Sequence, residues 1–300
     1  MHEFYCWACD LSKNTGEGNL ANLFIKKNIK YNFKIFTTKD IKIKNNFFIK
    51  IINYKYISPF IGVIFCWFFF LKRKKIVYIN YLPLWNFIIF MLLPPKTLLG
   101  PITGGANYNQ KQFFIRHFIF PIFYKISEIF INFRKTEIYF STDLLKKYLF
   151  NFTINKSKFN YIFKYYSKII KKRKDIDFLI YYRRHTNKES LFPYKLIKKL
   201  ITLNFKIHFV GDYFKNSNVI NHGYINNKLV NNLLSKTHFS LSSNENLYTL
   251  FTMECINNHV KIIINKSQIN NIKFYKKNFV FIDFKTINLQ KNYINNLKYL

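Results

Sequence analysis

The chain has 300 residues and 49% of them are apolar, which is enough material for two hydrophobic cores and excludes a wholly disordered protein. Lys and Arg number 48 against 14 Asp and Glu, a net charge of +34 that alone would favour a nucleic-acid partner. The excess is mostly Lys and accompanies heavy use of Ile, Asn, Phe and Tyr. We therefore interpret it as compositional drift, which leaves a basic surface suited to phosphate groups or to an anionic membrane.

Short β-like runs alternate with segments of helical spacing along the whole chain, as is typical of α/β units around parallel sheets. Strands are predicted at residues 3–8, 31–36, 76–80, 97–99 and 137–140, and then at 177–182, 205–210, 219–221, 238–241, 260–264 and 279–282. The clearest helices are 19–27, 113–132, 193–203, 228–234 and 246–257. A polar, Lys-rich stretch at about 151–174 separates the two series. The prediction is two Rossmann-like doubly wound domains, residues 1–160 and 161–300, which face each other across a cleft.

The first residues, MHEFYCWACD, include an acid and lack the basic lead of a signal peptide, so a cytoplasmic protein is expected. Cys6 and Cys9 form a lone CxxC, a spacing that fits a redox pair or half of a zinc site. No second pair of Cys or His completes such a site, and strand positions three apart face opposite sides. The preferred interpretation is small core residues in a reducing compartment.

Glycine is rare, with eight residues in all. Gly16 and Gly18, with Glu17 between them, are predicted to form a loop between the first strand and the first helix, and Gly104 and Gly105 follow the fourth strand. Glycine turns that lead into helix N-termini present backbone N–H groups to phosphate. The chain contains neither GxGxxG nor a P-loop lysine motif, so the sequence does not support a dehydrogenase or a P-loop kinase.

Two apolar runs, Phe60–Leu71 and Leu84–Leu93, stand out between the second and fourth predicted strands. Both are shorter than the roughly 20 residues that a membrane-spanning helix needs. The first run ends at the basic sequence KRKK. We interpret each run as a buried helix or as a helix that lies on a membrane with basic residues among the lipid head groups. A membrane-embedded structural protein is disfavoured by the same lengths.

The segment SLSSNENLYTLFTMECINNHVKIII at residues 240–264 places a polar turn with Glu245 before a helix with Glu254. It resembles the donor-binding segment of retaining GT-B glycosyltransferases, especially glycosyltransferase family four. In that family two glutamates contact the sugar and the nucleotide ribose, and their spacing here is one residue longer. The resemblance implies that Glu245 and Asn246 contact the donor sugar and that Glu254 holds the ribose.

Upstream, DFLIYYRRHTNK at residues 177–188 resembles the strand that this family follows with an arginine and, five residues on, a lysine. The resemblance implies that Arg183 and Lys188 hold the nucleotide diphosphate and stabilise it as it leaves, with Arg184 as a substitute candidate. Fixed cations lower a barrier at which negative charge develops, and arginine grips phosphate with two parallel N–H groups. The sequences FVGD and NHGYI, which contain Gly211 and Gly223, resemble strand ends near the nucleotide base.

The N-terminal half shares the resemblance. GT-B enzymes use the loop that DLSKNTGEGNLANLFI would form near the donor phosphates and the acceptor, and INYLPLWNFIIFMLLPPKTLLGPITGG is similar to bacterial cell-surface polysaccharide glycosyltransferases. His117 is a candidate for a bond to the donor or acceptor, with an ordinary core or surface histidine as the alternative. Asp10 or Glu17 would be the general base of an inverting enzyme, and a retaining enzyme needs none.

Residues and resemblance together predict a hexosyltransferase-like enzyme that moves a sugar from a nucleotide-sugar donor to a surface glycan or lipid-linked acceptor. We expect it to lie peripherally on the anionic inner face of the plasma membrane and to be retaining. No metal is expected, because Asp175 and Asp177 have DxD spacing but precede the strand, and no cofactor is expected besides the donor. The alternatives are a basic nucleic-acid-binding protein, whose cations would cluster with aromatics, and a non-catalytic membrane-associated relative. The plain alternatives for the site residues are carboxylates favoured by a helix dipole and solvated cations.

Overall fold

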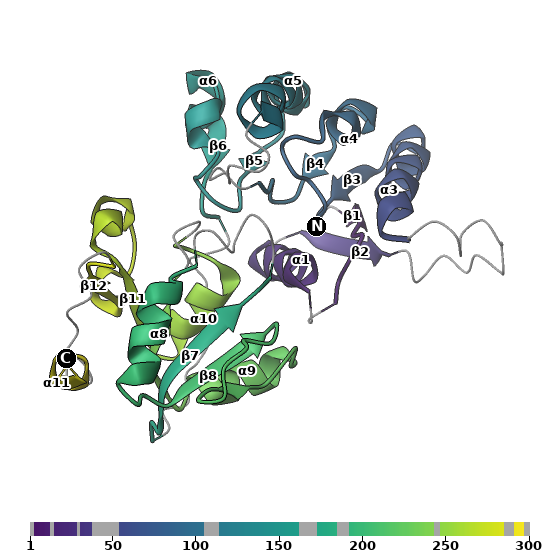
Figure 1. Cartoon of the computed structure of the whole chain (residues 1–300). Helices are drawn as coiled ribbons and strands as arrows, with labels where there is room; N and C mark the ends of the chain where they lie inside the picture. The colour runs from purple at the N-terminus through teal and green to yellow at the C-terminus, as the bar shows by residue number, and fades with distance from the viewer. Residues whose placement is uncertain are drawn as a thin grey trace. The chain divides into compact units, whose positions relative to one another are not determined.

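The computed structural model describes residues 3–12, 15–28, 31–37, 54–104, 114–161, 173–184, 192–242, 247–284 and 291–296. Within these residues the chain forms two compact units, the first containing the described residues up to Tyr161 and the second those from Arg173 onward. In Figure 1 the first unit runs from purple to teal and the second from green to yellow. Each unit is built on a parallel sheet flanked by helices.

The sheet of the first unit has the strand order β2-β1-β3-β4, with every pair parallel. Its strands are β1 (Glu3–Trp7), β2 (Asn32–Phe36), β3 (Lys75–Tyr78) and β4 (Leu98–Leu99), while β5 (Ile138–Tyr139) pairs with β6 (Ser157–Lys158). Its helices are α1 (Gly16–Lys27), α3 (Tyr54–Leu71), α4 (Phe87–Leu92), α5 (Phe120–Phe133) and α6 (Asn151–Lys156), with a π-turn at Ile115–Ile119 and a 3₁₀ turn at Lys146–Tyr148. The strand order reverses direction between β1 and β3.

Side chains of β1 and β3 alternate between two cores, because successive residues of a strand face opposite sides of the sheet. Cys6 and Val77 belong to the core under α1. Trp7 and Tyr78 belong to the core under α3, α4 and α5. Gly62 allows the close approach of α3, since a Cβ atom there would lie 2.3 Å from the Trp7 ring.

The sheet of the second unit has the order β12-β11-β10-β7-β8-β9, again all parallel. Its strands are β7 (Ile176–Tyr182), β8 (Ile207–Gly211), β9 (Ile220–Asn221), β10 (Thr237–Leu241), β11 (Lys261–Asn265) and β12 (Phe279–Ile282). Its helices are α8 (Tyr194–Thr202), α9 (Asn227–Leu234), α10 (Leu250–Asn257) and α11 (Lys291–Asn296), with 3₁₀ turns at Lys266–Asn271 and Lys276–Asn278. The chain starts in the middle at β7, moves outward to β9, and returns to place β10 beside β7.

The predicted fold class, an α/β protein with two Rossmann-like parallel-sheet domains, is confirmed. Two local predictions are wrong. Gly16, Glu17 and Gly18 form the first turn of α1 and not a loop, because Thr15 caps the helix by accepting a hydrogen bond from the Gly18 N–H at 3.0 Å. The first part of the Lys-rich stretch is no separator, because it forms α6 and β6 in the first unit, where Thr153 is buried.

The two apolar runs form α3 and α4, and each helix buries one side and exposes the other. On α3, Val63 and Cys66 are buried while Ile64 and Phe68 are exposed. Among the described residues, no helix is both long and apolar enough to cross a bilayer.

The four cysteines of the chain all lie in the described part and are free thiols. Cys6 is buried in β1, and the Sγ atom of Cys9 lies 3.4 Å from the Tyr78 hydroxyl oxygen. Burial raises the pKa of both thiols, so they are protonated and unreactive at neutral pH.

Candidate functional site

The topology of the second unit identifies where a ligand is expected. In open parallel sheets, ligands bind outside the carboxyl ends of the strands, at the point where the strand order reverses. Here that point lies between β7 and β10. The chain leaves β7 through Arg183 and Arg184 and leaves β10 through Ser242 toward α10.

Both arginines after β7 are exposed, although Tyr182 just before them is buried. The backbone N–H of Arg184 donates to Asp212 Oδ2 at 2.6 Å, and the Tyr224 hydroxyl donates to Asp212 Oδ1 at 2.7 Å. These two hydrogen bonds, assisted by the charges of Arg183 and Arg184, lower the pKa of the Asp212 carboxyl. The bond to Asp212 raises the pKa of Tyr224 to about 12. Asp212 therefore fixes the backbone turn that presents the two guanidinium groups.

Gly211 ends β8 and has a positive φ of 104°, a conformation that favours glycine. A Cβ atom there would lie 2.2 Å from the Tyr182 carbonyl oxygen, so the neighbouring strand already accounts for this glycine. Its N–H donates to the carbonyl of Gly223, which has a φ of 65° and open space around its Cα. Both glycines thus shape the turns beside the arginines.

Helix α10 begins after Thr249, whose side chain caps it by accepting a hydrogen bond from the Thr252 N–H at 3.1 Å. Glu254 follows one turn later. Burial raises the pKa of its carboxyl to about 7, and a side-chain hydrogen bond with Asn227, at the first turn of α9, opposes that rise. Glu254 thus lies in the middle of α10, with its carboxyl beside the first turn of α9, and in its ionised form it accepts hydrogen bonds.

Aromatic side chains connect the end of β7 with α10. The ring of Tyr181 lies 5.7 Å from the ring of Phe251, centroid to centroid. Tyr181 is also near enough to Tyr224 to raise the pKa of that phenol. The structure therefore brings Arg183, Arg184 and the α10 helix into one neighbourhood at the carboxyl edge of the sheet.

Several predicted site residues lie outside the described ranges, namely Lys188, Glu245, Asn246 and Gly105. Their assigned contacts stay predictions. The side chain of His117 is exposed in the π-turn before α5. Gly104 has a φ of 150°, and a Cβ atom there would lie 3.0 Å from the Leu145 side chain.

The first unit has its own reversal point, between β1 and β3, and the Asn80 carboxamide lies there. Its Oδ1 accepts from the Cys9 N–H at 2.8 Å, and its Nδ2 donates to the carbonyls of Asp10 at 2.6 Å and Glu17 at 3.3 Å. The Tyr81 N–H donates to Glu17 Oε2 at 3.4 Å. Asn80 therefore ties the end of β1, the end of β3 and the start of α1 together.

The two candidate bases of this unit are already engaged in that junction. Asp10 accepts from the Ser12 N–H at 2.7 Å through Oδ1 and from the Thr15 hydroxyl through Oδ2. Gly18 packs against the same loop, since a Cβ atom there would lie 2.1 Å from the Ser12 carbonyl oxygen, whereas Gly16 faces open space. Burial, followed by the charges of Asp10 and Glu17, raises the pKa of Tyr81 to about 12.

Sequence reasoning assigned no role to four polar residues that organise these edges, Asp212, Tyr224, Asn227 and Asn80, although the first two lie in the sequences FVGD and NHGYI. Each pairs with a residue far along the chain, which a local motif does not reveal. Two signals point to Asp212, which is one of only 14 acids and lies two residues after a predicted strand, at the end of the sequence FVGD.

No protein-family model matches this chain, and no curated protein matches it. Solved structures are similar in fold at low sequence identity. UDP-GlcNAc 2-epimerase from Methanocaldococcus jannaschii, in complex with UDP-GlcNAc and UDP, has a TM-score of 0.48 and 10% identity over 95% of this chain and 89% of its own. The Escherichia coli heptosyltransferase WaaC with ADP has a TM-score of 0.43 and 10% identity over 98% of this chain and 99% of its own.

Proposed function

We propose that this protein is a GT-B glycosyltransferase that transfers a sugar from a nucleotide-sugar donor to a glycan or a lipid-linked acceptor. The observation that carries the proposal is the carboxyl edge of the second sheet. At its reversal point, two exposed arginines follow the central strand, and a glutamate with a pKa of about 7 lies in the helix after the adjacent strand. The motif resemblance to glycosyltransferase family four assigns the same residues to the donor.

In the proposed reaction, the bond between the anomeric carbon and the donor phosphate oxygen breaks, and a bond to an acceptor hydroxyl oxygen forms. The nucleoside diphosphate leaves with the bonding electrons, and the proton of the acceptor hydroxyl passes to the phosphate oxygen that leaves. Arg183 and Arg184 would neutralise the diphosphate as its charge grows, with Lys188 as a further cation. Glu254 would accept hydrogen bonds from the ribose, and Glu245 with Asn246 would contact the sugar.

The finer features of the enzyme are part of the same proposal. We place it at the inner face of the plasma membrane, as a retaining enzyme that needs no metal. Retention fits the family resemblance, and it fits the engagement of Asp10 by Ser12 and Thr15, which leaves this carboxylate poorly placed to act as a base.

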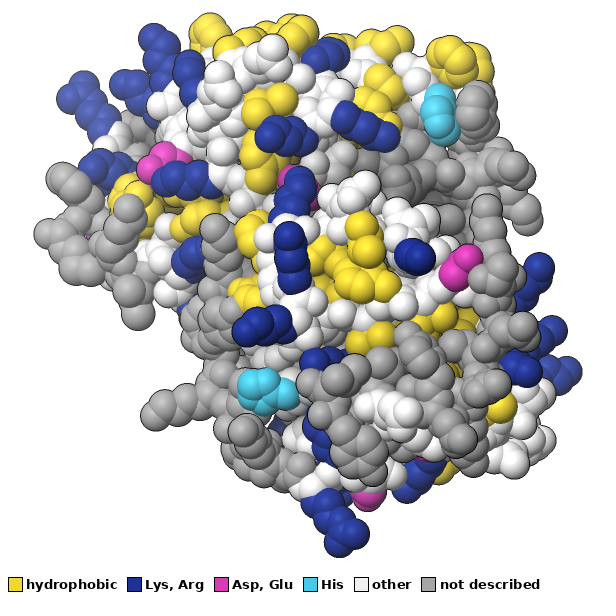
Figure 2. All heavy atoms as spheres, turned by 90° about the vertical axis from the view of Figure 1, so that its left-hand side faces the viewer, with side chains coloured by type: hydrophobic (Ala, Val, Ile, Leu, Met, Phe, Trp, Pro, Cys, Tyr) yellow, Lys and Arg dark blue, Asp and Glu magenta, His cyan; other side chains and the backbone are white. Residues whose placement is uncertain are grey.

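The rival nucleic-acid-binding function is less well supported by the distribution of charge. On the described part of the face in Figure 2, Lys and Arg side chains occur in several separate places among hydrophobic and neutral ones. A nucleic-acid groove would gather them along one track.

The test is donor binding by isothermal titration calorimetry, with a panel of UDP-, GDP- and ADP-sugars. We expect one donor class to bind, and Arg183→Ala combined with Arg184→Ala to weaken it at least about tenfold, as expected for lost charge-assisted phosphate contacts. Arg173→Ala is the matched control, because Arg173 is an exposed arginine that precedes the same strand β7 at its other end. An equal loss of donor affinity in Arg173→Ala and in the double variant would refute the proposal. DNA binding with a steep salt dependence, without donor binding, would refute it as well.

A further inference from the structure

We propose that the first unit docks on an anionic lipid bilayer through the outer side of α3, α4 and α5, with the basic residues after α3 among the lipid head groups. The surface would bring the enzyme to a lipid-linked acceptor, and in that respect it rests on the proposed function. Docking itself needs neither donor nor catalysis, so the two proposals are tested separately.

The outer side of α3 is a continuous apolar stripe. Its exposed side chains recur at helical spacing and belong to Phe60, Ile64, Trp67, Phe68 and Leu71. Ile64 and Leu71 expose 70% and 75% of their surface, far more than a side chain that serves only the protein core. A stripe of this kind on a helix that is too short to span is typical of a helix that lies in the membrane interface.

The neighbouring helices extend this stripe into a face. Trp67 Nε1 of α3 donates to the Leu92 carbonyl of α4 at 2.7 Å. Ser127 Oγ of α5 donates to the Leu84 carbonyl at 2.6 Å, and the buried Arg134 donates to the Leu93 carbonyl at 3.0 Å. Exposed apolar residues continue across these helices at Trp85, Ile88, Met91, Leu92, Ile122, Ile129 and Phe133. Figure 2 shows hydrophobic side chains along its upper edge, at the level of α5 and α6 in Figure 1.

The charges around this face select an anionic partner. Helices α3 and α4 contain no Asp or Glu. The sole acid of α5, Glu128, is buried and accepts from the Phe150 N–H at 2.6 Å and from Lys125 at 3.4 Å. The chain then leaves α3 through the sequence KRKK at residues 72–75. Cations near a helix C-terminus also complement the helix dipole, but a dipole does not explain the exposed apolar stripe beside them.

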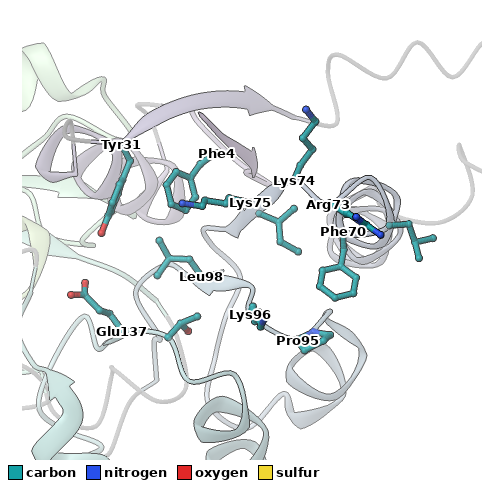
Figure 3. A pocket seen from close by; sticks show the side chains of 13 residues that line it. Phe4, Tyr31, Phe70, Arg73, Lys74, Lys75, Pro95, Lys96, Leu98 and Glu137 are labelled. Atoms are coloured by element: carbon teal, nitrogen blue, oxygen red, sulfur yellow. The ribbon is translucent and has the colours of Figure 1, made fainter. Parts of the chain in front are cut away.

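A pocket opens where α3 and α4 end, at the amino edge of the sheet (Figure 3). Its volume is about 730 Å³, and apolar side chains such as Phe4, Phe70 and Leu98 line it. In Figure 3, Lys75 reaches across it toward Phe4, with its Nζ 5.6 Å from the ring centroid. Arg73, Lys74 and Lys96 add further cations to the lining, which also contains one acid, Glu137, paired with Lys158 at 3.1 Å. The cations outnumber the single paired acid, so the pocket fits a lipid head group whose phosphate meets the cations and whose glycerol and chain ends meet the rings.

Arg73 and Lys96 share a conformation that makes them useful for a test. Their φ angles are 55° and 63°, in the left-handed region. Asparagine tolerates this region well, so Arg73→Asn with Lys96→Asn removes two charges without backbone strain. Ile64→Ser with Leu71→Ser removes the apolar contact at two highly exposed positions, where folding depends little on either side chain.

The experiment is co-flotation of the 300-residue chain with phosphatidylcholine vesicles, with and without phosphatidylglycerol, in the absence of donor. We expect binding to the anionic vesicles, a loss of at least about tenfold in Ile64→Ser/Leu71→Ser, and a loss of roughly fivefold per charge in Arg73→Asn/Lys96→Asn. The control pairs lie in the second unit, Leu229→Ser/Ile269→Ser for exposed apolar residues and Lys276→Gln/Lys277→Gln for exposed cations.

Insertion is separated from charge attraction by tryptophan quenching. Trp67 and Trp85 are partly exposed on the proposed face, whereas Trp7 is fully buried. Lipids brominated on their acyl chains should quench the wild-type fluorescence and should quench Ile64→Ser/Leu71→Ser far less. Binding without quenching, or equal losses in the test and control pairs, would overturn the proposal. Lipid-free self-association that Ile64→Ser/Leu71→Ser abolishes would overturn it too, because the face would then belong to a second copy of the chain.

Discussion

At the scale of single residues, the raised pKa of the Glu254 carboxyl makes the stability of the second unit depend on pH. Its pKa is about 7 in the folded chain, because burial disfavours the carboxylate, against about 4.5 in the unfolded chain. Between these values the folded state binds more protons than the unfolded state, so stability falls as the pH rises through this window. The difference corresponds to about 3 kcal/mol at pH 8.

Glu254→Gln should therefore stabilise the second unit at pH 8 and change it little at pH 4, because the amide never has to lose a proton. Urea unfolding followed by circular dichroism at both pH values measures this. If Glu254 holds the ribose as proposed, the same variant should bind the donor at least about tenfold more weakly, since the hydrogen bonds to a charged acceptor are lost. If Glu254→Gln is stabilised at pH 8 but binds the donor as tightly as the wild type, Glu254 has a raised pKa but is not part of the donor site.

His208 and His222 form a second titrating pair, in β8 and just after β9. Their ring nitrogens Nδ1 and Nε2 lie 2.9 Å apart. Burial, then the charge of His222, lowers the pKa of His208 to about 4. The unfolded chain therefore binds more protons than the folded chain between about pH 6.5 and pH 4, so stability is lost as the pH falls through that range.

His208→Gln should flatten this acid-side loss of stability, measured as the change in urea midpoint between pH 7 and pH 5. The exposed His259, replaced by Asn, is the control and should keep the wild-type slope. An unchanged slope in His208→Gln would show that other groups cause the acid sensitivity.

At the scale of an element, the end of strand β8 requires glycine at position 211. Its φ of 104° and the 2.2 Å approach of a would-be Cβ to the Tyr182 carbonyl both oppose a side chain. Gly211→Ala should destabilise the second unit by at least about 2 kcal/mol. Gly223→Ala, at a φ of 65° in open space, should cost only about 1–2 kcal/mol. Denaturant unfolding followed by circular dichroism compares them, and an equal cost would mean that the contact with Tyr182 relaxes.

The elements of this chain could largely be predicted from the sequence, because the buried strands are runs of aromatic and β-branched residues. Strand β12 was predicted to the residue and β7 to within one. The start of α1 was not, because Gly16 and Gly18 favour a turn locally. The Thr15 cap and the close Ser12 carbonyl over Gly18 override that preference.

The candidate site could be predicted only in part, for a related reason. Arg183 and Glu254 follow or lie in predicted elements, and their assignment to a donor site, which comes from the motif resemblance, stays a prediction. Asn80 contacts Asp10 across 70 residues, and Asp212 contacts Arg184 across 28. Such contacts depend on strand order, which composition and periodicity do not specify. Strand β6 escaped prediction too, since its two residues have no apolar pattern.

At the scale of the whole molecule, tryptophan distribution gives a way to observe the two units separately. The chain has three tryptophans, Trp7, Trp67 and Trp85, and all lie in the first unit. Tryptophan fluorescence therefore follows that unit, while circular dichroism follows both. We expect two unfolding transitions in urea, of which only one appears by fluorescence.

A bound donor should move these transitions unequally. Because the proposed diphosphate and ribose contacts lie in the second unit, a donor at 100 times its dissociation constant should stabilise that unit by about 2.7 kcal/mol. The fluorescence transition should stay in place. A donor-induced shift of the fluorescence transition alone would instead assign the nucleotide to the first unit.

The short strand β3 of the first sheet sets a distance between the two ends of the first unit's sheet. Strand β3 has four residues, Lys75–Tyr78, and so spans only about 13 Å. Lys75 begins it at the pocket of Figure 3, and Asn80 follows two residues beyond its far end. If both proposals hold and the acceptor reaches the Asn80 junction, an acceptor whose phosphate is held at the pocket must extend about 13 Å, the length of β3, to arrive there. Such an enzyme would favour acceptors with a carbohydrate stem at least this long.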